Sequence, residues 1–217
     1  MCLTTDTQIV GKRERDVRLN FTIPKHLSVS ILEKYNFTGT VPEVTAKFKG
    51  NNEFDWTIIK HMKEVSGLPV IPKGISNYDD TIIALEHGAD GIFLSNHGAR
   101  QLDTTPGTIE CLPEVVRAVR DSGRKVPIFF DGGVRKGSDV LKALALGADV
   151  VMIGRPVLYG LACDGQNGIE KVLSILNDEL KEAMLHTGCM NISDAKNNSK
   201  LIYGDGDSLF TNSFGMR

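Results

Sequence analysis

The stretch 126-VPIFFDGGVRKGSDVLKALALGADVVMIGRP-156 decides the fold class of this chain. It holds an apolar run (Val126–Phe130), a loop with two glycines, an apolar helical pattern that includes Val140 and Leu144, and a second apolar run (Val150–Ile153). Short apolar runs bounded by Gly and Asp are typical of strands buried on both faces of a parallel sheet. Strand, helix and strand in this order form the unit from which α/β proteins are built.

The same alternation continues toward the N-terminus and beyond residue 156. Three further strands are predicted at Cys2–Thr7, Leu68–Lys73 and Gly91–Ser95. Apolar residues at helical spacing predict helices around residues 58–65, 79–86, 106–122, 140–146 and 167–186. The sequence therefore predicts an α/β protein with five β/α units and a parallel sheet.

Two stretches lack this pattern. Residues 18–52 are polar and irregular, which indicates a loop insertion after the first strand. Residues 191–217 are also weakly patterned and predict a weakly ordered tail. We therefore expect one domain over residues 1–190, which includes the insertion.

The composition of the 217 residues excludes several classes of function. The 25 Lys and Arg against 27 Asp and Glu give a formal net charge of −2, which argues against a nucleic-acid-binding protein. No apolar run is long enough to predict a membrane span. The 4 cysteines lack metal-ligand spacing and are interpreted as reduced thiols, neither a disulfide framework nor a zinc site. We expect an intracellular protein, cytoplasmic or organellar (peroxisome or mitochondrion), with no visible targeting signal.

Two architectures are compatible with a parallel α/β sheet. A doubly wound sheet that binds a dinucleotide has GxGxxG after a strand, and this sequence has none. A (β/α)8 barrel of the TIM type instead carries its chemistry where the strands end. Polar residues occupy those positions here, namely Asp6, Lys73, Asn96-His97, Asp131 and Gly154-Arg155. The barrel is therefore favoured. A complete barrel has eight units and needs about 250 residues, whereas the pattern of this chain predicts only five units.

Two glycine-containing loops follow the last two predicted strands. They are Asp131-Gly132-Gly133-Val134-Arg135 and Gly154-Arg155. Glycines let backbone N–H groups approach an anion, arginines supply charge, and the last two loops of a barrel commonly bind phosphate. The alternative is that the glycines only form a tight turn and the arginines are solvated.

The run Ser95-Asn96-His97-Gly98-Ala99-Arg100-Gln101 is the candidate catalytic segment. A His at a strand end can act as a base while an Arg three residues later holds a carboxylate. The alternative is a structural His. Lys73 ends another strand and either points into the same site or lies on the surface.

These segments resemble the FMN-dependent α-hydroxy-acid oxidase and dehydrogenase family, which includes glycolate oxidase, flavocytochrome b2 and lactate oxidases. The similarity runs from about Leu3 to about Gly188 and corresponds to barrel units four to eight. The resemblance implies an FMN hydroxy-acid dehydrogenase domain that is a partial barrel. It implies FMN as cofactor and oxidation of a small (S)-2-hydroxy acid of the glycolate or L-lactate class to the 2-oxo acid.

The resemblance also implies roles for individual residues. His97 matches the catalytic base and contacts substrate, and Asp6 matches its carboxylate partner. Arg13 and Arg100 match the arginines that hold the substrate carboxylate. The residues that match cofactor-binding positions are Thr4, Lys73, Ser95, Asp131, Gly132, Gly133, Val134, Arg135, Gly154 and Arg155.

The resemblance leaves several alternatives open. The electron acceptor is O2, a cytochrome or a quinone, and a homo-oligomer is an expectation from the family. One alternative to an active enzyme is an inactive half-barrel that needs a missing N-terminal half. Another is a different flavin barrel such as an FMN-dependent isomerase, which would have little use for Arg13 and Arg100 as a carboxylate clamp.

Overall fold

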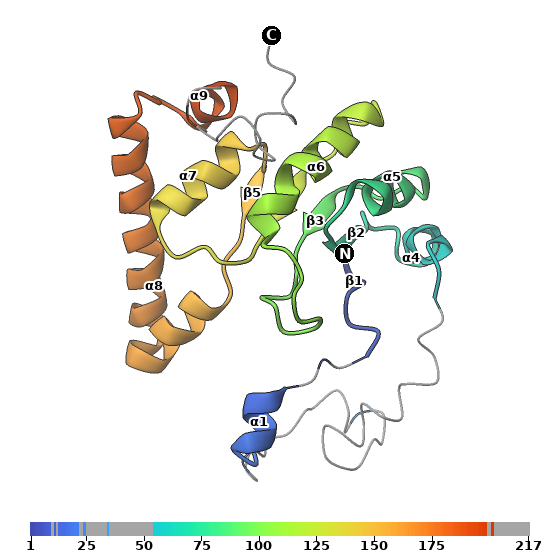
Figure 1. The fold of residues 1–217 in the computed structure, drawn as a ribbon, viewed down its shortest axis with the longest axis horizontal. Coiled ribbons are helices and arrows are strands. Elements are labelled where there is room, and N and C mark those ends of the chain that lie inside the picture. Colours follow the sequence, from blue (N-terminus) through green and yellow to red (C-terminus); the bar gives the residue numbers. More distant parts are fainter. Residues whose placement is uncertain are drawn as a thin grey trace.

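The computed structural model of the chain describes residues 1–9, 11, 13–21, 24, 34, 54–198 and 201. Its centre is a parallel sheet of five strands in the order β1-β2-β3-β4-β5 (Figure 1). The strands are β1 (Cys2–Thr4), β2 (Ile71–Ile75), β3 (Ile92–Leu94), β4 (Ile128–Phe130) and β5 (Val150–Val151). All five predicted strands are confirmed, and their spatial order follows the chain without the reversal that a doubly wound sheet requires.

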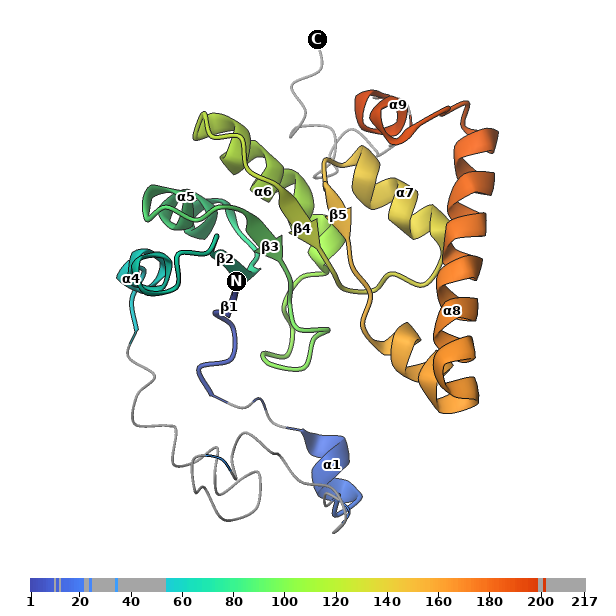
Figure 2. The same ribbon diagram turned by 180° about the vertical axis from the view of Figure 1, so that it is seen from behind.

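The described helices alternate with these strands. They are α1 (Glu14–Arg18), α4 (Thr57–Ser66), α5 (Tyr78–Glu86), α6 (Thr108–Asp121), α7 (Gly137–Ala145), α8 (Arg155–His186) and α9 (Ile192–Asn197). Helices α5, α6 and α7 lie along the sheet in the same order as in the chain, and α8 packs on α7 (Figures 1 and 2). The helix predicted over 167–186 in fact begins at Arg155, and non-helical dihedral angles at Asp164 and Gly165 divide it into two parts.

The prediction of a weakly ordered tail from residue 191 is wrong for its first residues, because they form α9. The Asn191 side chain accepts a hydrogen bond from the N–H of Asp194, and Asp194 caps Asn191 in return. Ala195 is fully buried against Leu141 of α7. The rest of that tail and nearly all of the predicted insertion at 18–52 lie outside the described residues.

The hydrophobic core lies between the sheet and the apolar faces of α4, α5, α6 and α7. Its central members are fully or almost fully buried and include Ile59, Leu85, Leu94, Leu112, Val115 and Phe130. α6 contributes Cys111, Leu112, Val115 and Val119 at the spacing of one helix face. Across the described ranges, no helix combines the length and apolarity that crossing a membrane requires.

Two aspartates, Asp90 and Asp149, bind the backbone at the start of β2 and of β4. In Gly88-Ala89-Asp90, the Asp90 carboxylate accepts the N–H of Val70 at 2.8 Å, just before β2, and the Asp90 N–H donates to the Val70 carbonyl at 2.9 Å. Gly147-Ala148-Asp149 repeats this arrangement on Ile128, with both distances at 2.8 Å. Each of these aspartates also forms an ion pair with a lysine, Lys63 for Asp90 and Lys196 for Asp149.

Asp90 gives the fold a testable pH dependence. Burial disfavours the charged carboxylate, but the hydrogen bonds from Lys63 and Val70 outweigh it, so the pKa of Asp90 is lowered. A lowered folded-state pKa stabilises the fold above about pH 4, the unfolded pKa of Asp, and this stability is lost as the pH falls through the folded value. We expect Asp90→Asn to reduce the free energy of unfolding by about 1–2 kcal/mol at pH 7. The difference from wild type should shrink below about pH 4.

Urea unfolding of both proteins at several pH values measures this difference. Asp164→Asn, at an exposed carboxylate, is the control and should leave the stability nearly unchanged. A destabilisation by Asp90→Asn that stays constant as the pH falls would contradict the assignment of the effect to this carboxylate.

Candidate active site

The segments that follow the strands meet at one end of the sheet. The register aligns Thr4 with Lys73 and Leu94 with Phe130, so neighbouring strands end at the same level. Figure 2 shows the chain leaving β1, β3 and β5 on the same side of the sheet. The carboxyl ends of parallel strands are where barrels carry their reactive residues.

His97 and Asp6 form a pair across this end of the sheet. Nδ1 of His97 lies 3.2 Å from Oδ1 of Asp6, although 91 residues separate them in the sequence. The His97 and Asp6 side chains are 27% and 16% exposed. A carboxylate on one ring nitrogen orients the imidazole and leaves the other nitrogen to exchange a proton with a ligand.

The backbone that carries His97 is in a rarely populated conformation. Residues His97, Gly98 and Ala99 have φ angles of 57°, 66° and 59°. The Asn96 side chain accepts the N–H groups of Gly98 at 3.1 Å and Ala99 at 3.3 Å, and Ser95 Oγ accepts that of His97 at 3.1 Å. Non-glycine residues at positive φ are held by their surroundings and cluster at functional sites.

Lys73 connects β2 to the next two strands. Its Nζ donates to Ser95 Oγ at 2.7 Å and pairs with Asp131 Oδ2 at 3.2 Å. It also lies 4.9 Å from the centroid of the Phe93 ring. The sequence left open whether Lys73 was a surface residue, and its side chain is only 19% exposed.

The first glycine-containing loop is anchored by a threonine. Thr108 Oγ1 donates to the Asp131 carbonyl at 2.6 Å, and Thr108 is 3% exposed. Gly132 has φ +104°, and a Cβ there would lie 2.5 Å from Thr108 Oγ1, so only glycine fits. Val134 is buried in the core, whereas a Cβ added at Gly133 would meet open space.

The two predicted phosphate-binding arginines are Arg155, the first residue of α8, and Arg135, in the loop before α7. The Arg135 guanidinium lies 5.9 Å from the centroid of the Tyr159 ring, and Arg155 Nη2 donates to the Gly98 carbonyl at 3.0 Å. No side chain caps this end of α8 at Gly154. Uncapped N–H groups and two guanidinium groups attract an anion.

Arg13 and Arg100 are electrostatically coupled. Burial lowers the pKa of Arg13, and the positive charge of Arg100 lowers it further. Arg13 Nη2 donates to Gln101 Oε1 at 3.0 Å, while Arg100 is exposed. Two guanidinium groups that repel each other are stabilised by an anion between them.

The unpartnered polar atoms point to the same place. Within the described part of the chain, the buried side-chain nitrogen and oxygen atoms without a hydrogen-bond partner are Asp6 Oδ2, Arg13 Nη1 and Asp131 Oδ1. All three belong to residues predicted for the site from the sequence. Because buried polar atoms are normally satisfied, these three indicate a polar ligand.

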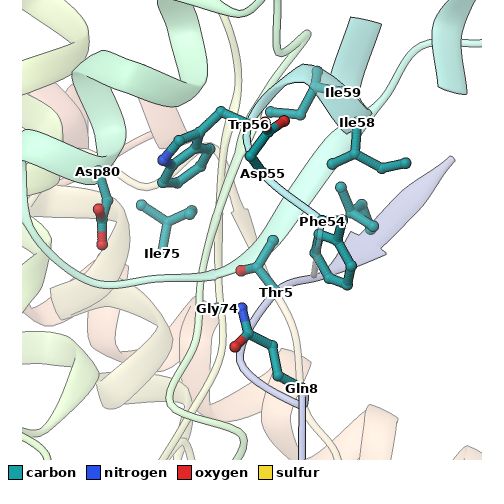
Figure 3. Close-up of a pocket in the computed structure, with 11 residues that line it drawn as sticks. Thr5, Gln8, Phe54, Asp55, Trp56, Ile58, Ile59, Gly74, Ile75 and Asp80 are labelled. Carbon is teal, nitrogen blue, oxygen red and sulfur yellow. The ribbon is translucent and has the colours of Figure 1, made fainter. Parts of the chain in front are cut away.

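A cavity of about 260 Å³ lies on the opposite face of β1 (Figure 3). Successive side chains of a strand point to opposite faces, so Leu3 and Thr5 line this cavity and Thr4 and Asp6 do not. Trp56, Ile59 and Ile75 also line it. The cavity contains none of the predicted site residues and is not the candidate active site.

Two contributors to the site were not predicted from the sequence. Thr108 holds the Asp131 loop, and Gln101 holds the segment from Asp6 to Arg13. Thr108 begins a helix directly after Gly107, which is a recognisable pattern but does not reveal the loop that it contacts. Gln101 lies within the candidate catalytic segment, but the sequence pattern assigns it no role.

A parallel sheet with glycine-containing loops, paired cations and a His–Asp pair at its carboxyl ends is the arrangement expected of a candidate active site on a barrel-type α/β fold. Residues 1–201 match the model of the FMN-dependent dehydrogenase family, and the chain belongs to this family. The cofactor of the family is FMN, which is the cofactor that the resemblance implied.

Similar proteins of known function share this assignment. The chain is 42% identical to glycolate oxidase 3 of Oryza sativa subsp. indica, over 94% of this chain and 57% of that protein. It is 46% identical to the 2-hydroxyacid oxidase of Dictyostelium discoideum, over 91% and 50%, and 43% identical to human 2-hydroxyacid oxidase 1, over 88% and 53%. The chain thus spans about half the length of the curated relatives it matches.

Solved structures establish the architecture. A lactate oxidase of Pediococcus acidilactici superimposes with a TM-score of 0.79 at 40% identity, over 91% of this chain and 52% of that one. A mandelate oxidase complexed with (S)-2-phenylpropionate gives a TM-score of 0.74 at 36% identity, over 89% and 52%. The fold is therefore of the (β/α)8 barrel type with five β/α units present, as the sequence predicted.

Proposed function

We propose that this chain carries the catalytic part of an FMN-dependent enzyme that oxidises a small (S)-2-hydroxy acid, of the glycolate or L-lactate class, to the 2-oxo acid. The observation that carries the proposal is the His97–Asp6 pair together with the unpartnered Arg13 Nη1 in the same site. A base and a cation that needs an anion suit a substrate with both a hydroxyl and a carboxylate.

The residues present fit FMN. The unpartnered Asp131 Oδ1 suits a ribityl hydroxyl donor, and the open space at Gly133 and Gly154 lets a phosphate approach the backbone. Arg135 and Arg155 supply positive charge for that phosphate. We assign cofactor contacts to these residues and also to Thr4, Lys73, Ser95, Gly132 and Val134. Bound FMN would accept the two electrons of the substrate.

Each catalytic group has a defined task in this proposal. Asp6 holds the Nδ1 side of His97, so Nε2 takes the substrate proton, and the carboxylate stabilises the imidazolium that results. Arg13 and Arg100 hold the substrate carboxylate and so orient the hydroxyl-bearing carbon. Lys73, fixed by Ser95 and Asp131, places a cation where a reduced flavin ring would gain negative charge.

The open sheet favours a second candidate, an inactive half-barrel that needs an N-terminal half. Among the residues that the structure describes, strands β1 and β5 each pair with a strand on one side only. Apolar side chains at and after β5 are exposed, with Val150 at 38% and Met152 at 42%. An open edge with apolar residues is suited to pairing with further strands.

Purification of the chain alone and with a partner separates the two candidates. We expect the chain alone to retain FMN at well below one per protein after gel filtration, because its sheet is open. Co-expression with the N-terminal part of human 2-hydroxyacid oxidase 1, up to the matched region, should raise the FMN content. Glycolate or L-lactate should then bleach the flavin absorbance anaerobically.

The two results have different meanings. Stoichiometric FMN on the chain alone, bleached by either acid, would reject the half-barrel candidate and support the enzyme. Protein that binds FMN in neither preparation, or binds it but is not reduced by any 2-hydroxy acid tested, would reject the proposed function.

A further inference from the structure

The Gln101 side chain forms four hydrogen bonds, all of them with the segment from Asp6 to Arg13. Its Nε2 donates to the carbonyls of Asp6 at 3.1 Å and Ile9 at 2.9 Å. Its Oε1 accepts from the N–H of Gly11 at 3.4 Å and from Arg13 Nη2 at 3.0 Å. A glutamine amide offers two donors and two lone pairs, so all four are used between residues 6 and 13.

The backbone at Gly11 lies very close to the backbone at Arg100 and Gln101. A Cβ on Gly11 would lie 2.4 Å from the carbonyl oxygen of Arg100 and 2.8 Å from Cα of Gln101. Only glycine therefore lets the segment after β1 reach the segment after β3. Gly11 and Gln101 together form one junction between these two parts of the site.

The junction holds two residues with different tasks. Asp6 pairs with His97, and Arg13 carries the unpartnered Nη1 that suits a substrate carboxylate. Apolar packing contributes little here, because Ile9 is 66% exposed. The distance between the proton acceptor and the carboxylate holder therefore depends on polar contacts, and four of them converge on one side chain.

We propose that Gln101 is a positioning residue that sets Arg13 and Asp6 relative to His97. The inference rests on the proposed function for its meaning, but the junction itself is a property of the polypeptide. Loss of the amide releases Arg13 on one side and the Asp6–Ile9 backbone on the other. Displacement of a reacting group by about 1 Å can cost about 100-fold in rate, so the effect on ligand binding and reaction should be large.

Three variants test the junction. Gln101→Ala removes all four hydrogen bonds, whereas Gln101→Glu keeps the acceptor for Gly11 and Arg13 but loses both donors. Gln166→Ala is the matched control, because it removes a glutamine amide that donates a hydrogen bond to Glu170 on the same helix, α8. Thermal unfolding of each variant establishes that the core remains folded.

Hydrogen exchange is the first readout and needs no bound FMN. We expect the Gly11 amide to exchange much faster in Gln101→Ala than in wild type, at an intermediate rate in Gln101→Glu, and at the wild-type rate in Gln166→Ala. The second readout is the dissociation constant of oxalate, a small carboxylate probe, in the FMN-loaded protein from the co-expression described above. It should rise about 10- to 100-fold in Gln101→Ala, with FMN content unchanged.

Unchanged Gly11 exchange in Gln101→Ala overturns the inference and leaves the proposed function standing. Faster exchange with unchanged oxalate affinity also overturns it, because the junction would then hold the segment without positioning Arg13. Wild-type protein that holds FMN but binds no oxalate would instead reject the carboxylate-binding part of the proposed function. The two failures are thus distinguishable.

Discussion

Replacement of His97 by alanine should lower the rate of FMN reduction by glycolate or L-lactate by about 100- to 10,000-fold, the usual contribution of a positioned general base. The His97 side chain contacts Asp6, whereas the contact with Ser95, a proposed FMN-binding residue, is made by the His97 backbone N–H. Replacement by alanine keeps this backbone contact. FMN content should therefore stay at the wild-type level. Anaerobic mixing of the FMN-loaded protein with substrate, followed by visible absorbance, measures the rate.

The control for this prediction is His186→Ala. His186 ends α8, its side chain is 77% exposed, and it lies beside Glu182, one turn earlier in the same helix. This variant should be reduced at the wild-type rate. A His97→Ala protein that is reduced as fast as the control would show that His97 is not the base.

Gly137→Ala should produce a large loss of stability, although Gly137 lies outside the site. A Cβ at Gly137, the first residue of α7, would lie 2.0 Å from the Leu180 nitrogen and 2.3 Å from the Glu179 carbonyl carbon. These are backbone atoms of α8 and cannot move aside without separating the helices. We expect the free energy of unfolding to fall by about 3 kcal/mol, at the upper end of the cost of overpacking.

Urea or thermal unfolding measures this loss. The separation would also weaken the small cluster of Leu141, Leu180 and Cys189 and the hydrogen bond from the Gly137 N–H to Glu179 at 2.7 Å. Ser138→Ala, one residue later in α7, is the control and should change stability by less than about 0.5 kcal/mol. Equal stability of the two variants would mean that α7 and α8 are not in this close approach.

The strands could be predicted from the sequence because burial on both faces leaves a continuous apolar run. The run Gly91–Ser95 becomes β3, in which Ile92 and Leu94 are fully buried. The start of α8 was missed because Leu158, Tyr159 and Leu161 are all more than half exposed and so give no amphipathic pattern. The capping residues Asn191 and Asp194 were a usable signal for α9 that the weak apolar pattern obscured.

The sequence predicted the individual segments of the site, but not the contacts between them. Strand ends could be recognised one by one, and the family resemblance named their roles. The contacts between them could not be read, because Asp6 and His97 are 91 residues apart and Arg13 and Gln101 are 88 apart. Such pairs depend on which strands are neighbours and on the register between them, and local spacing contains neither.

The two aspartates that precede β3 and β5 have a consequence for how such a barrel is assembled. Asp90 and Asp149 each bind the residue at the start of the preceding strand through both backbone and side chain. Each of these contacts joins one strand to its immediate predecessor in the sheet. The alignment of β3 on β2 and of β5 on β4 is thus specified by a residue just ahead of the second strand of each pair.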